Sequence, residues 1–213
     1  MKPFKIEYKL TDIIIDAIHK LGIEFVENQL SALNQYASML IKWNKVYSLT
    51  AISNPRQIKI LHLIDGLSIV PHLPDNNGFV LDVGSGMGVP GIIIAIMKPN
   101  LHVTLIDSNS KKIAFLRQVK IELRLANLEI VNSRVEKYDI QRFDIITSRA
   151  FADLSLFISL TEHLLNDSGY YLAMKSQQAS NEADKLNNYS SEIINLQVPY
   201  LDAPRVLVKI KKL

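Results

Sequence analysis

A glycine-rich loop in this 213-residue chain lies between two apolar runs. Each run has a carboxylate at or near its end. The first run, Phe79–Val83, leads directly into the loop Gly84–Gly88, and the second run, Leu101–Asp107, ends about 20 residues after the first glycine. Glycines let the backbone turn tightly and approach a ligand, and an acid at the end of a second strand can bind both hydroxyls of a ribose. The alternative role for Asp107 is to cap the helix that follows it. We favour a nucleotide-type site at the start of a helix.

The spacing of the glycines separates two kinds of ribose-bearing cofactor. Dinucleotide sites prefer G-x-G-x-x-G, whereas the loop here reads G-x-G-x-G. This variant resembles the loop of the class I S-adenosylmethionine (SAM) methyltransferases, in which the loop wraps the methionine end of SAM and the acid holds its ribose. The resemblance implies a SAM site that includes Gly84, Gly86, Val89 and Asp107.

The composition limits the other kinds of chemistry. The chain has no cysteine, which excludes disulfides, thiolate metal sites and a cysteine nucleophile. The five histidines are scattered without ligand spacing, so we expect no metal. No apolar run reaches the ~20 residues of a membrane span, and no secretory signal is visible, so we expect a cytoplasmic protein. The net charge of +3 permits an anionic partner without requiring one.

The segment before the glycine loop is predicted to be helical. Apolar residues at helical spacing indicate three helices there, over residues 8–22, from about 24 or 28 to 41, and over 56–73. We therefore divide the chain into an N-terminal helical extension, residues 1–74, packed on a methyltransferase domain, residues 75–213.

Three side chains in this extension are candidates for specific roles. Trp43 is the only tryptophan, and we favour a role in anchoring the extension to the core over stacking on a base. His62 and Asp65 are three positions apart, so they face the same side of a helix. We interpret this pair as a structural hydrogen bond.

Strands alternate with helices along the rest of the chain. Further strand patterns cover residues 128–133, 143–148 and 169–174, and helix patterns cover 92–97, 110–127 and 154–165. Residues 192–198 and 205–211 read as a closing antiparallel hairpin. This order predicts a Rossmann-like α/β fold, with a seven-strand, mostly parallel sheet and helices on both faces.

Three longer motifs resemble the RsmG (GidB) family. Residues 43–50 resemble its W-N-x-x-x-N-L-T signature, His62 and Asp65 match its H-x-x-D, and Gly84–Gly91 match its G-S-G-x-G-x-P-G loop. The resemblance covers roughly residues 30–212, with departures from the family pattern at Ser48, Gly66 and Ser176. Members of this family are bacterial enzymes that methylate N7 of one guanine in 16S ribosomal RNA. The resemblance implies SAM as cofactor and 16S ribosomal RNA, or the small-subunit particle, as substrate.

Several residues follow strand ends, where ligands bind in open parallel sheets. In the methyltransferase architecture, backbone groups of Val135 and Glu136 are placed to read the adenine edge, and Arg149 is assigned to the methyl-transfer end of the cofactor pocket. Arg134 and Lys175 are candidates for binding RNA phosphates or for polarising guanine O6. The alternative for all three cations is simple solvation at the surface.

The helix predicted over residues 110–127 has a basic outer face. This face, called the basic face below, consists of Lys111, Lys112, Arg117, Lys120 and Arg124. Such a run of charge is often only a solvated surface, but its position beside the cofactor site makes phosphate binding an equal alternative.

Methylation of guanine N7 agrees with what the residues allow. N7 has a free lone pair and no proton, so it can attack a sulfonium methyl without a general base. Thr147-Ser148-Arg149-Ala150 lacks the N-P-P-Y-like tetrapeptide common in enzymes that methylate exocyclic amines. We therefore expect a monomeric enzyme that works by positioning, with no catalytic acid or base. The alternatives are a SAM-dependent methyltransferase for a small molecule, an NAD-binding oxidoreductase, and a non-catalytic nucleotide-binding RNA module.

Overall fold

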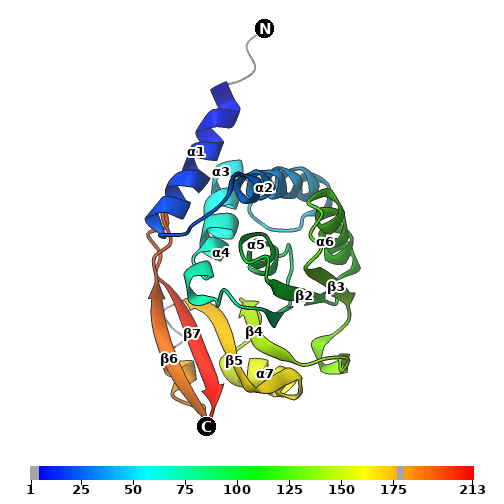
Figure 1. The fold of residues 1–213 in the computed structure, drawn as a ribbon, viewed down its shortest axis with the longest axis vertical. Helices are drawn as coiled ribbons and strands as arrows, with labels where there is room; N and C mark the ends of the chain where they lie inside the picture. Colours follow the sequence, from blue (N-terminus) through cyan, green and yellow to red (C-terminus); the bar gives the residue numbers. More distant parts are fainter. Residues whose placement is uncertain (1–4, 177–179) are drawn as a thin grey trace.

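A seven-stranded sheet forms the centre of the protein (Figure 1). The computed structural model describes residues 5–176 and 180–213. The strands are β1 (Gly78–Val83), β2 (Leu101–Asp107), β3 (Leu128–Asn132), β4 (Phe143–Arg149), β5 (Leu165–Ser176), β6 (Tyr189–Leu196) and β7 (Arg205–Lys212). They lie in the order β3-β2-β1-β4-β5-β7-β6, and only β7 runs antiparallel to its neighbours β5 and β6. The mostly parallel sheet and its closing hairpin confirm the predicted fold class.

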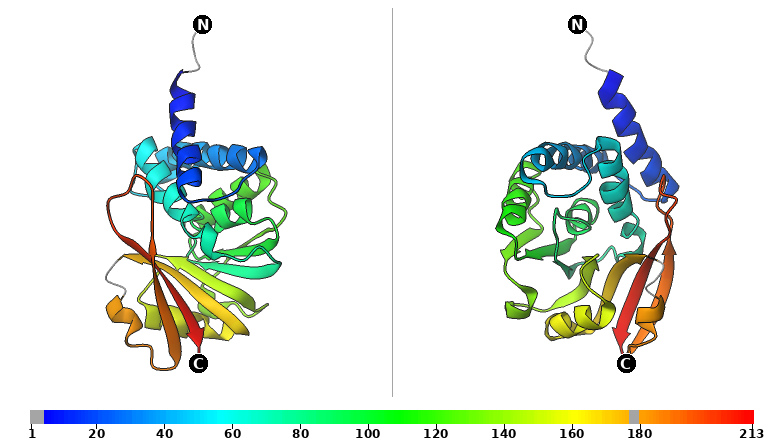
Figure 2. Two further views of the ribbon diagram at one scale, coloured as in Figure 1. Left: turned by 60° about the vertical axis from the view of Figure 1, so that its left-hand side comes forward. Right: turned by 180° about the vertical axis from the view of Figure 1, so that it is seen from behind.

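Helices cover both faces of this sheet (Figures 1 and 2). One face carries α1 (Lys5–Lys20), α2 (Glu27–Tyr47), α3 (Pro55–Ile58), α4 (Asp65–Leu67), α5 (Gly91–Met97) and α6 (Ser110–Glu122), and the other carries α7 (Leu154–Thr161) and α8 (Ser180–Ala183). Strand side chains alternate between the two layers, so that Val80 packs in the first layer and Leu81 in the second. None of the helices described is long and apolar enough to cross a membrane.

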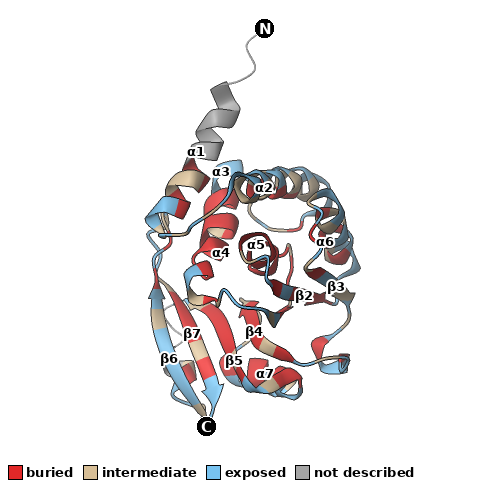
Figure 3. Cartoon of the chain, viewed as in Figure 1, coloured by how far each residue is buried: buried red, intermediate tan, exposed pale blue. Residues whose placement is uncertain are grey.

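The short helix α5 fixes one side of the glycine loop. All of its residues are buried (Figure 3), and it lies between the sheet and α2. A helix that is apolar all round is stable only when it is enclosed on every side. Because the loop runs from the buried strand β1 to this buried helix, both of its ends are held by the core.

The N-terminal helices share a core with the sheet. Ile14 of α1 and Leu33 of α2 belong to the same apolar cluster as Val103 and Leu105 of β2. The division into an extension, residues 1–74, and a domain, residues 75–213, stays a prediction, because this cluster continues across the boundary.

The helix predicted over residues 56–73 is divided into shorter pieces. After α3 comes a π-helical turn, Lys59–Ile64, then α4, and then a 3₁₀ turn at Val70–His72. Pro71 has no backbone N–H, so an α-helix could not continue through it without losing a bond. π-Helical turns are rare and frequently lie at functional sites, and this one contains His62.

Other element boundaries also differ from the prediction, and two of them have a clear physical reason. The helix expected to reach residue 127 ends at Glu122, because Arg124 takes a left-handed conformation at φ 51°. The N–H of Leu125 then bonds to the carbonyl of Lys120 at 3.1 Å, which closes the helix end. Strand β5 begins earlier than predicted, because Leu165 pairs with Phe143 of β4.

Candidate functional site

The glycine loop folds back over the end of β2. Gly84, Gly86 and Gly88 have φ values of 65°, 59° and 99°, which side chains with a β-carbon rarely adopt. The N–H of Gly84 donates to the carbonyl of Ile106 at 2.9 Å, and that of Gly86 donates to Oδ2 of Asp107 at 2.9 Å. The loop and the acid predicted to act together are therefore in direct contact.

Asp107 is not the cap of the following helix. Asn109 is the N-cap of α6, where its Oδ1 accepts from the N–H groups of Lys111 and Lys112. Oδ1 of Asp107 accepts from the N–H of Asn109 at 2.8 Å, and its Oδ2 accepts from Gly86. Each carboxylate oxygen has a further lone pair, so Asp107 can still accept hydrogen bonds from a ligand.

A cavity of about 410 Å³ opens beside Asp107. This Asp107 cavity is lined by residues at or just after the carboxyl ends of four strands and by residues of the neighbouring helices. Among them are Gly84, Asp107, Lys112, Arg134, Val135, Glu136, Ala150 and Phe151. Four of the residues predicted for the cofactor are thus together: Gly84, Asp107, Val135 and Glu136. Gly86 is not part of the lining, but its N–H is bonded to Asp107, which is.

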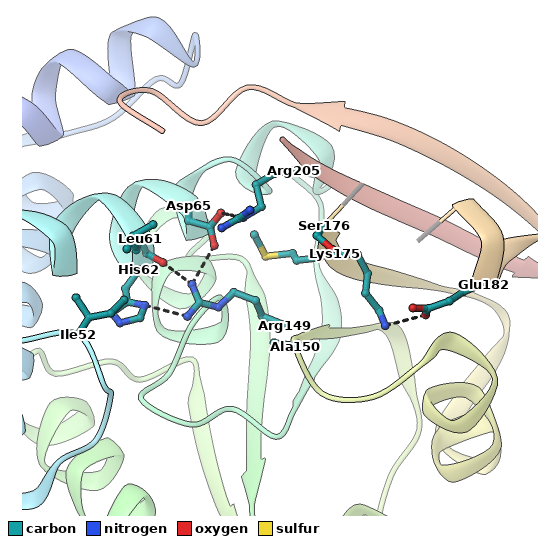
Figure 4. Close-up of a pocket in the computed structure, with 11 residues that line it drawn as sticks. Ile52, Leu61, His62, Asp65, Arg149, Ala150, Lys175, Ser176, Glu182 and Arg205 are labelled. Carbon is teal, nitrogen blue, oxygen red and sulfur yellow. Dashed lines mark hydrogen bonds and ion pairs between the residues drawn. The ribbon is translucent and has the colours of Figure 1, made fainter. Parts of the chain in front are cut away.

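Two other residues predicted for the cofactor lie elsewhere. Val89 is only 3% exposed and packs towards Gly66 of α4, outside the lining of the Asp107 cavity. Arg149 lines a second cavity, of about 510 Å³ (Figure 4). This Arg149 cavity is lined by Ile52, Leu61, His62, Asp65, Arg149, Ala150, Met174, Lys175, Ser176, Glu182 and Arg205.

The guanidinium of Arg149 is held by three acceptors from the helical segment before the sheet. Its NH1 donates to the carbonyl of Leu61 at 2.7 Å and to Oδ2 of Asp65 at 2.9 Å, and its NH2 bonds to Nδ1 of His62 at 2.9 Å. Asp65, whose side chain is 4% exposed, also pairs with Nε of Arg205 at 3.3 Å. The predicted bond between His62 and Asp65 is therefore replaced by bonds from each of them to Arg149 (Figure 4).

The hydrogen bonds fix the protonation state of His62. A guanidinium only donates, so Nδ1 accepts and the proton lies on Nε2, which donates to Oγ1 of Thr50 at 3.0 Å. Burial and the nearby charge of Arg149 lower the pKa of His62 to about 4. The imidazole is therefore neutral at physiological pH and serves as a fixed acceptor.

Residues 43–50, the first of the three family motifs, support the hydrogen bonds among Arg149, His62 and Asp65. Trp43 packs on Phe115 of α6 with ring centroids 5.5 Å apart, which confirms its predicted anchoring role. The side chain of Asn44 accepts from the N–H of Thr50 at 2.8 Å and donates to the carbonyl of Ile52 at 2.9 Å. Asn44 and Thr50 thus position His62 and one wall of the Arg149 cavity.

Sequence reasoning assigned no role to several residues of this network. Asn44 and Thr50 are part of the W-N-x-x-x-N-L-T motif, which by itself gives them no role, and no local sequence pattern marks Arg205 or Glu182. Arg205 could have been found from topology alone, because it begins the strand that pairs with the end of β5, where Ser176 lies opposite it.

The two cations expected to bind RNA differ in solvent exposure and in the bonds that they already make. Arg134 is exposed, with 70% of its side-chain surface accessible and a long contact of 3.7 Å to Glu136. Lys175 is 14% exposed, and its ammonium donates to the carbonyl of Ala152 and to Oε2 of Glu182. A phosphate contact by Lys175 stays a prediction that would require these bonds to be replaced, whereas Arg134 needs no such exchange.

Asp82 is a buried carboxyl group beneath the loop. Its Oδ2 accepts from the N–H of Gly91 at 3.0 Å, while its Oδ1 has no hydrogen-bond partner among the described residues. Burial raises the pKa of Asp82 to about 7, against the opposing effects of the Gly91 N–H and Arg149. Within the described part of the chain, no group of His, Cys, Asp or Glu side chains could hold a metal ion.

Known protein structures resemble this one in fold. A SAM-dependent methyltransferase from Aquifex aeolicus superposes with a TM-score of 0.59 at 13% identity, over 76% of this chain and 96% of its own. A protein from Methanococcus maripaludis described as a putative S-adenosyl-L-methionine-dependent methyltransferase gives 0.58 at 16% identity, over 83% and 91%. These neighbours support the class I methyltransferase fold.

Sequence relatives are much closer. The ribosomal RNA small subunit methyltransferase G of Chromobacterium violaceum is 48% identical over 193 residues, 89% of this chain and 92% of its own. That of Methylobacillus flagellatus is 45% identical over 192 residues, 90% and 93% of the two chains. The family described as GidB, rRNA small subunit methyltransferase G, matches residues 29–208. The chain therefore belongs to the rRNA small subunit methyltransferase G family.

Proposed function

We propose that this enzyme transfers the methyl group of SAM to N7 of one guanine in 16S ribosomal RNA. Membership of the family supports a SAM-dependent methyltransferase that acts on RNA of the small ribosomal subunit. One observation carries the assignment of sites: Ala150 lines both the Asp107 cavity and the Arg149 cavity. A cofactor in the first and a base in the second would meet at the carboxyl edge of the sheet, where ligands bind in this architecture.

The lining of the Asp107 cavity fits SAM. The free lone pairs of Asp107 suit the two ribose hydroxyls. The amides of Val135 and Glu136 begin a 3₁₀ turn, Val135–Lys137, so they have no partner within it and can bind the adenine edge. A β-carbon at Gly84 would lie 2.6 Å from the ring of Phe151, so only glycine fits the turn beneath that ring. When bound, SAM supplies an electrophilic methyl group.

The Arg149 cavity offers donors for a guanine. Three acceptors hold the guanidinium of Arg149, and its remaining N–H groups are fixed in place before the base arrives. We assign them to guanine O6, beside the N7 lone pair, where fixed donors can orient the base without reorganising. N7 carries no proton, so the chain needs no general base. Its contribution is to orient the base and to exclude water.

The remaining surface suits a polyanion. Arg134 is exposed and lines the Asp107 cavity, and Lys112 of the basic face lines the same cavity. We assign both to RNA phosphates, either of free 16S ribosomal RNA or of the small-subunit particle. We infer that the enzyme acts as a monomer, and that it acts in the cytoplasm because the relatives in its family modify ribosomal RNA.

Methyl transfer from labelled SAM tests the function directly. Purified enzyme is incubated with 16S ribosomal RNA, with small subunits from a strain that lacks this gene, and with free guanosine triphosphate. We expect label only in the RNA, at a single guanine that becomes sensitive to cleavage at 7-methylguanosine. Labelling of the free nucleotide alone would indicate a small-molecule enzyme, and calorimetry that showed binding of NADH but not of SAM would indicate an oxidoreductase.

A further inference from the structure

One turn of the chain forms the wall between the two cavities. Ala150 lines both of them and has a φ of 54°, which is uncommon for a residue with a β-carbon. The next residue, Phe151, covers the glycine turn so closely that a β-carbon at Gly84 would lie 2.6 Å from its ring. The position of this turn therefore sets the space in the Asp107 cavity beside Gly84.

Two charged side chains hold this turn from the side of the Arg149 cavity. The ammonium of Lys175 donates to the carbonyl of Ala152 and, at 2.9 Å, to Oε2 of Glu182. The same Oε2 accepts from the N–H of Leu154 at 3.0 Å. One carbonyl and one N–H of the turn are thus bound by a cation and an anion. The cation and the anion also bind each other, as Figure 4 shows.

The surroundings suit a holding role. The side chains of Lys175 and Glu182 are 14% and 33% exposed, so water competes only weakly for these charge-assisted bonds. A left-handed alanine persists only where the neighbouring structure holds it in place. Lys175 at the end of β5 and Glu182 in α8 provide this hold from parts of the chain far from the turn in sequence.

We propose that Lys175 and Glu182 are positioning residues that fix the turn from Ala150 to Leu154, and through Phe151 set the affinity for SAM. This inference rests on the proposed function, because it takes the Asp107 cavity as the SAM site. It also gives Lys175 a role different from an RNA phosphate contact: the lysine lines the cavity for the base and acts on the cavity for the cofactor.

Variants of the pair separate these two roles. Lys175→Met, Glu182→Gln and the double variant are compared with Lys212→Met and Glu162→Gln. The controls break another Lys–Glu pair, 2.6 Å apart and about half exposed, which joins the end of β7 to the 3₁₀ turn after α7. Neither residue lines the Asp107 cavity or the Arg149 cavity. SAM affinity is measured by calorimetry, and RNA affinity is measured at several salt concentrations.

We expect each variant of the Lys175–Glu182 pair to weaken SAM binding by at least about tenfold, and the double variant to lose little more than either single one. The log–log salt slope of RNA binding should stay as in the wild type, and both controls should bind SAM within about twofold. Because Lys175→Arg keeps the charge and the donors, it should restore most of the SAM affinity, and this rescue separates positioning from a general loss of folding.

Three results would overturn the inference. A salt slope shallower by about 0.7–0.9 with unchanged SAM affinity would make Lys175 a phosphate contact. Unchanged values for both quantities would show that the turn does not need the pair. A loss of SAM affinity that Lys175→Arg does not restore would indicate unfolding instead of positioning. Failure of the proposed function itself is distinguishable, because then the wild type would bind no SAM or methylate no RNA.

Discussion

The carboxylate of Asp107 receives backbone N–H groups from the glycine loop on one side and from the start of α6 on the other. These bonds hold the carboxylate at the edge of the Asp107 cavity and leave a lone pair on each oxygen available to a ligand. Its neighbour Asn109 performs the capping that Asp107 could have performed. The acid Asp107 and the amide Asn109 therefore have separable functions, which single substitutions can distinguish.

Asp107→Ala should weaken SAM binding by at least about tenfold. Hydrogen bonds to a charged group contribute roughly 1.5–3 kcal/mol each, and about 1.4 kcal/mol corresponds to a factor of ten in affinity. Isothermal calorimetry measures the change. The matched control is Asn109→Ala, which removes the helix cap and should lower the free energy of unfolding by about 1 kcal/mol while leaving SAM affinity nearly unchanged. If the two variants behaved alike towards SAM, Asp107 would have only a structural role.

At the scale of elements, the departure from the family motif at Ser48 has a physical reading. Ser48 is the residue after α2 and adopts a left-handed conformation, with φ 51° and ψ 53°, while its N–H donates to the carbonyl of Asn44. Asparagine and glycine enter this region more readily than serine. The asparagine that the family usually has here is thus the residue that the helix end favours.

Ser48→Asn and Ser48→Gly should stabilise the protein by up to about 1 kcal/mol. The left-handed conformation costs a residue with a β-carbon roughly 1–2 kcal/mol, and part of this is recovered in each variant. Urea unfolding followed through Trp43 fluorescence measures the difference. Ser53→Asn is the control, because this serine is also exposed but has no positive φ. A loss of stability in both Ser48 variants would show that the serine hydroxyl contributes more than the backbone conformation costs.

The sequence predicts well those elements whose structure depends on residues close together in the chain. The order of strand, glycine loop, helix, strand and acid depends on neighbouring residues, and the structure has it as predicted in β1, α5 and β2. The partners of Arg149 could not be predicted in this way. They come from the helical segment before the sheet, 84 and more positions away. Two of them, the Leu61 carbonyl and the His62 ring, belong to a π-helical turn that apolar spacing does not distinguish from an α-helix.

At the scale of the whole molecule, burial shifts two titrating groups in opposite directions. The pKa of His62 falls to about 4, so its folded form stays neutral where the unfolded form, with an ordinary pKa of 6.5, becomes protonated. The pKa of Asp82 rises from 3.8 to about 7, so its folded form binds a proton that the unfolded form has lost. Between about pH 4 and pH 6.5, folding therefore releases a proton at His62 and takes one up at Asp82.

These two effects on stability should offset each other in the wild type, and single substitutions should reveal them. His62 alone makes the free energy of unfolding rise with pH across this window, whereas Asp82 alone makes it fall.

In Asp82→Asn only the His62 effect remains. The difference in unfolding free energy between this variant and the wild type should therefore change in favour of the variant by about 1.4 kcal/mol per pH unit as pH rises from 4.5 to 6.5. Urea unfolding at several pH values measures this slope, and His62→Gln should show the opposite slope because Asp82 alone remains. All other titrating groups are common to the compared proteins and cancel in the difference, so curves for Asp82→Asn and wild type that ran parallel across the window would show that the buried carboxyl is ionised in the folded protein.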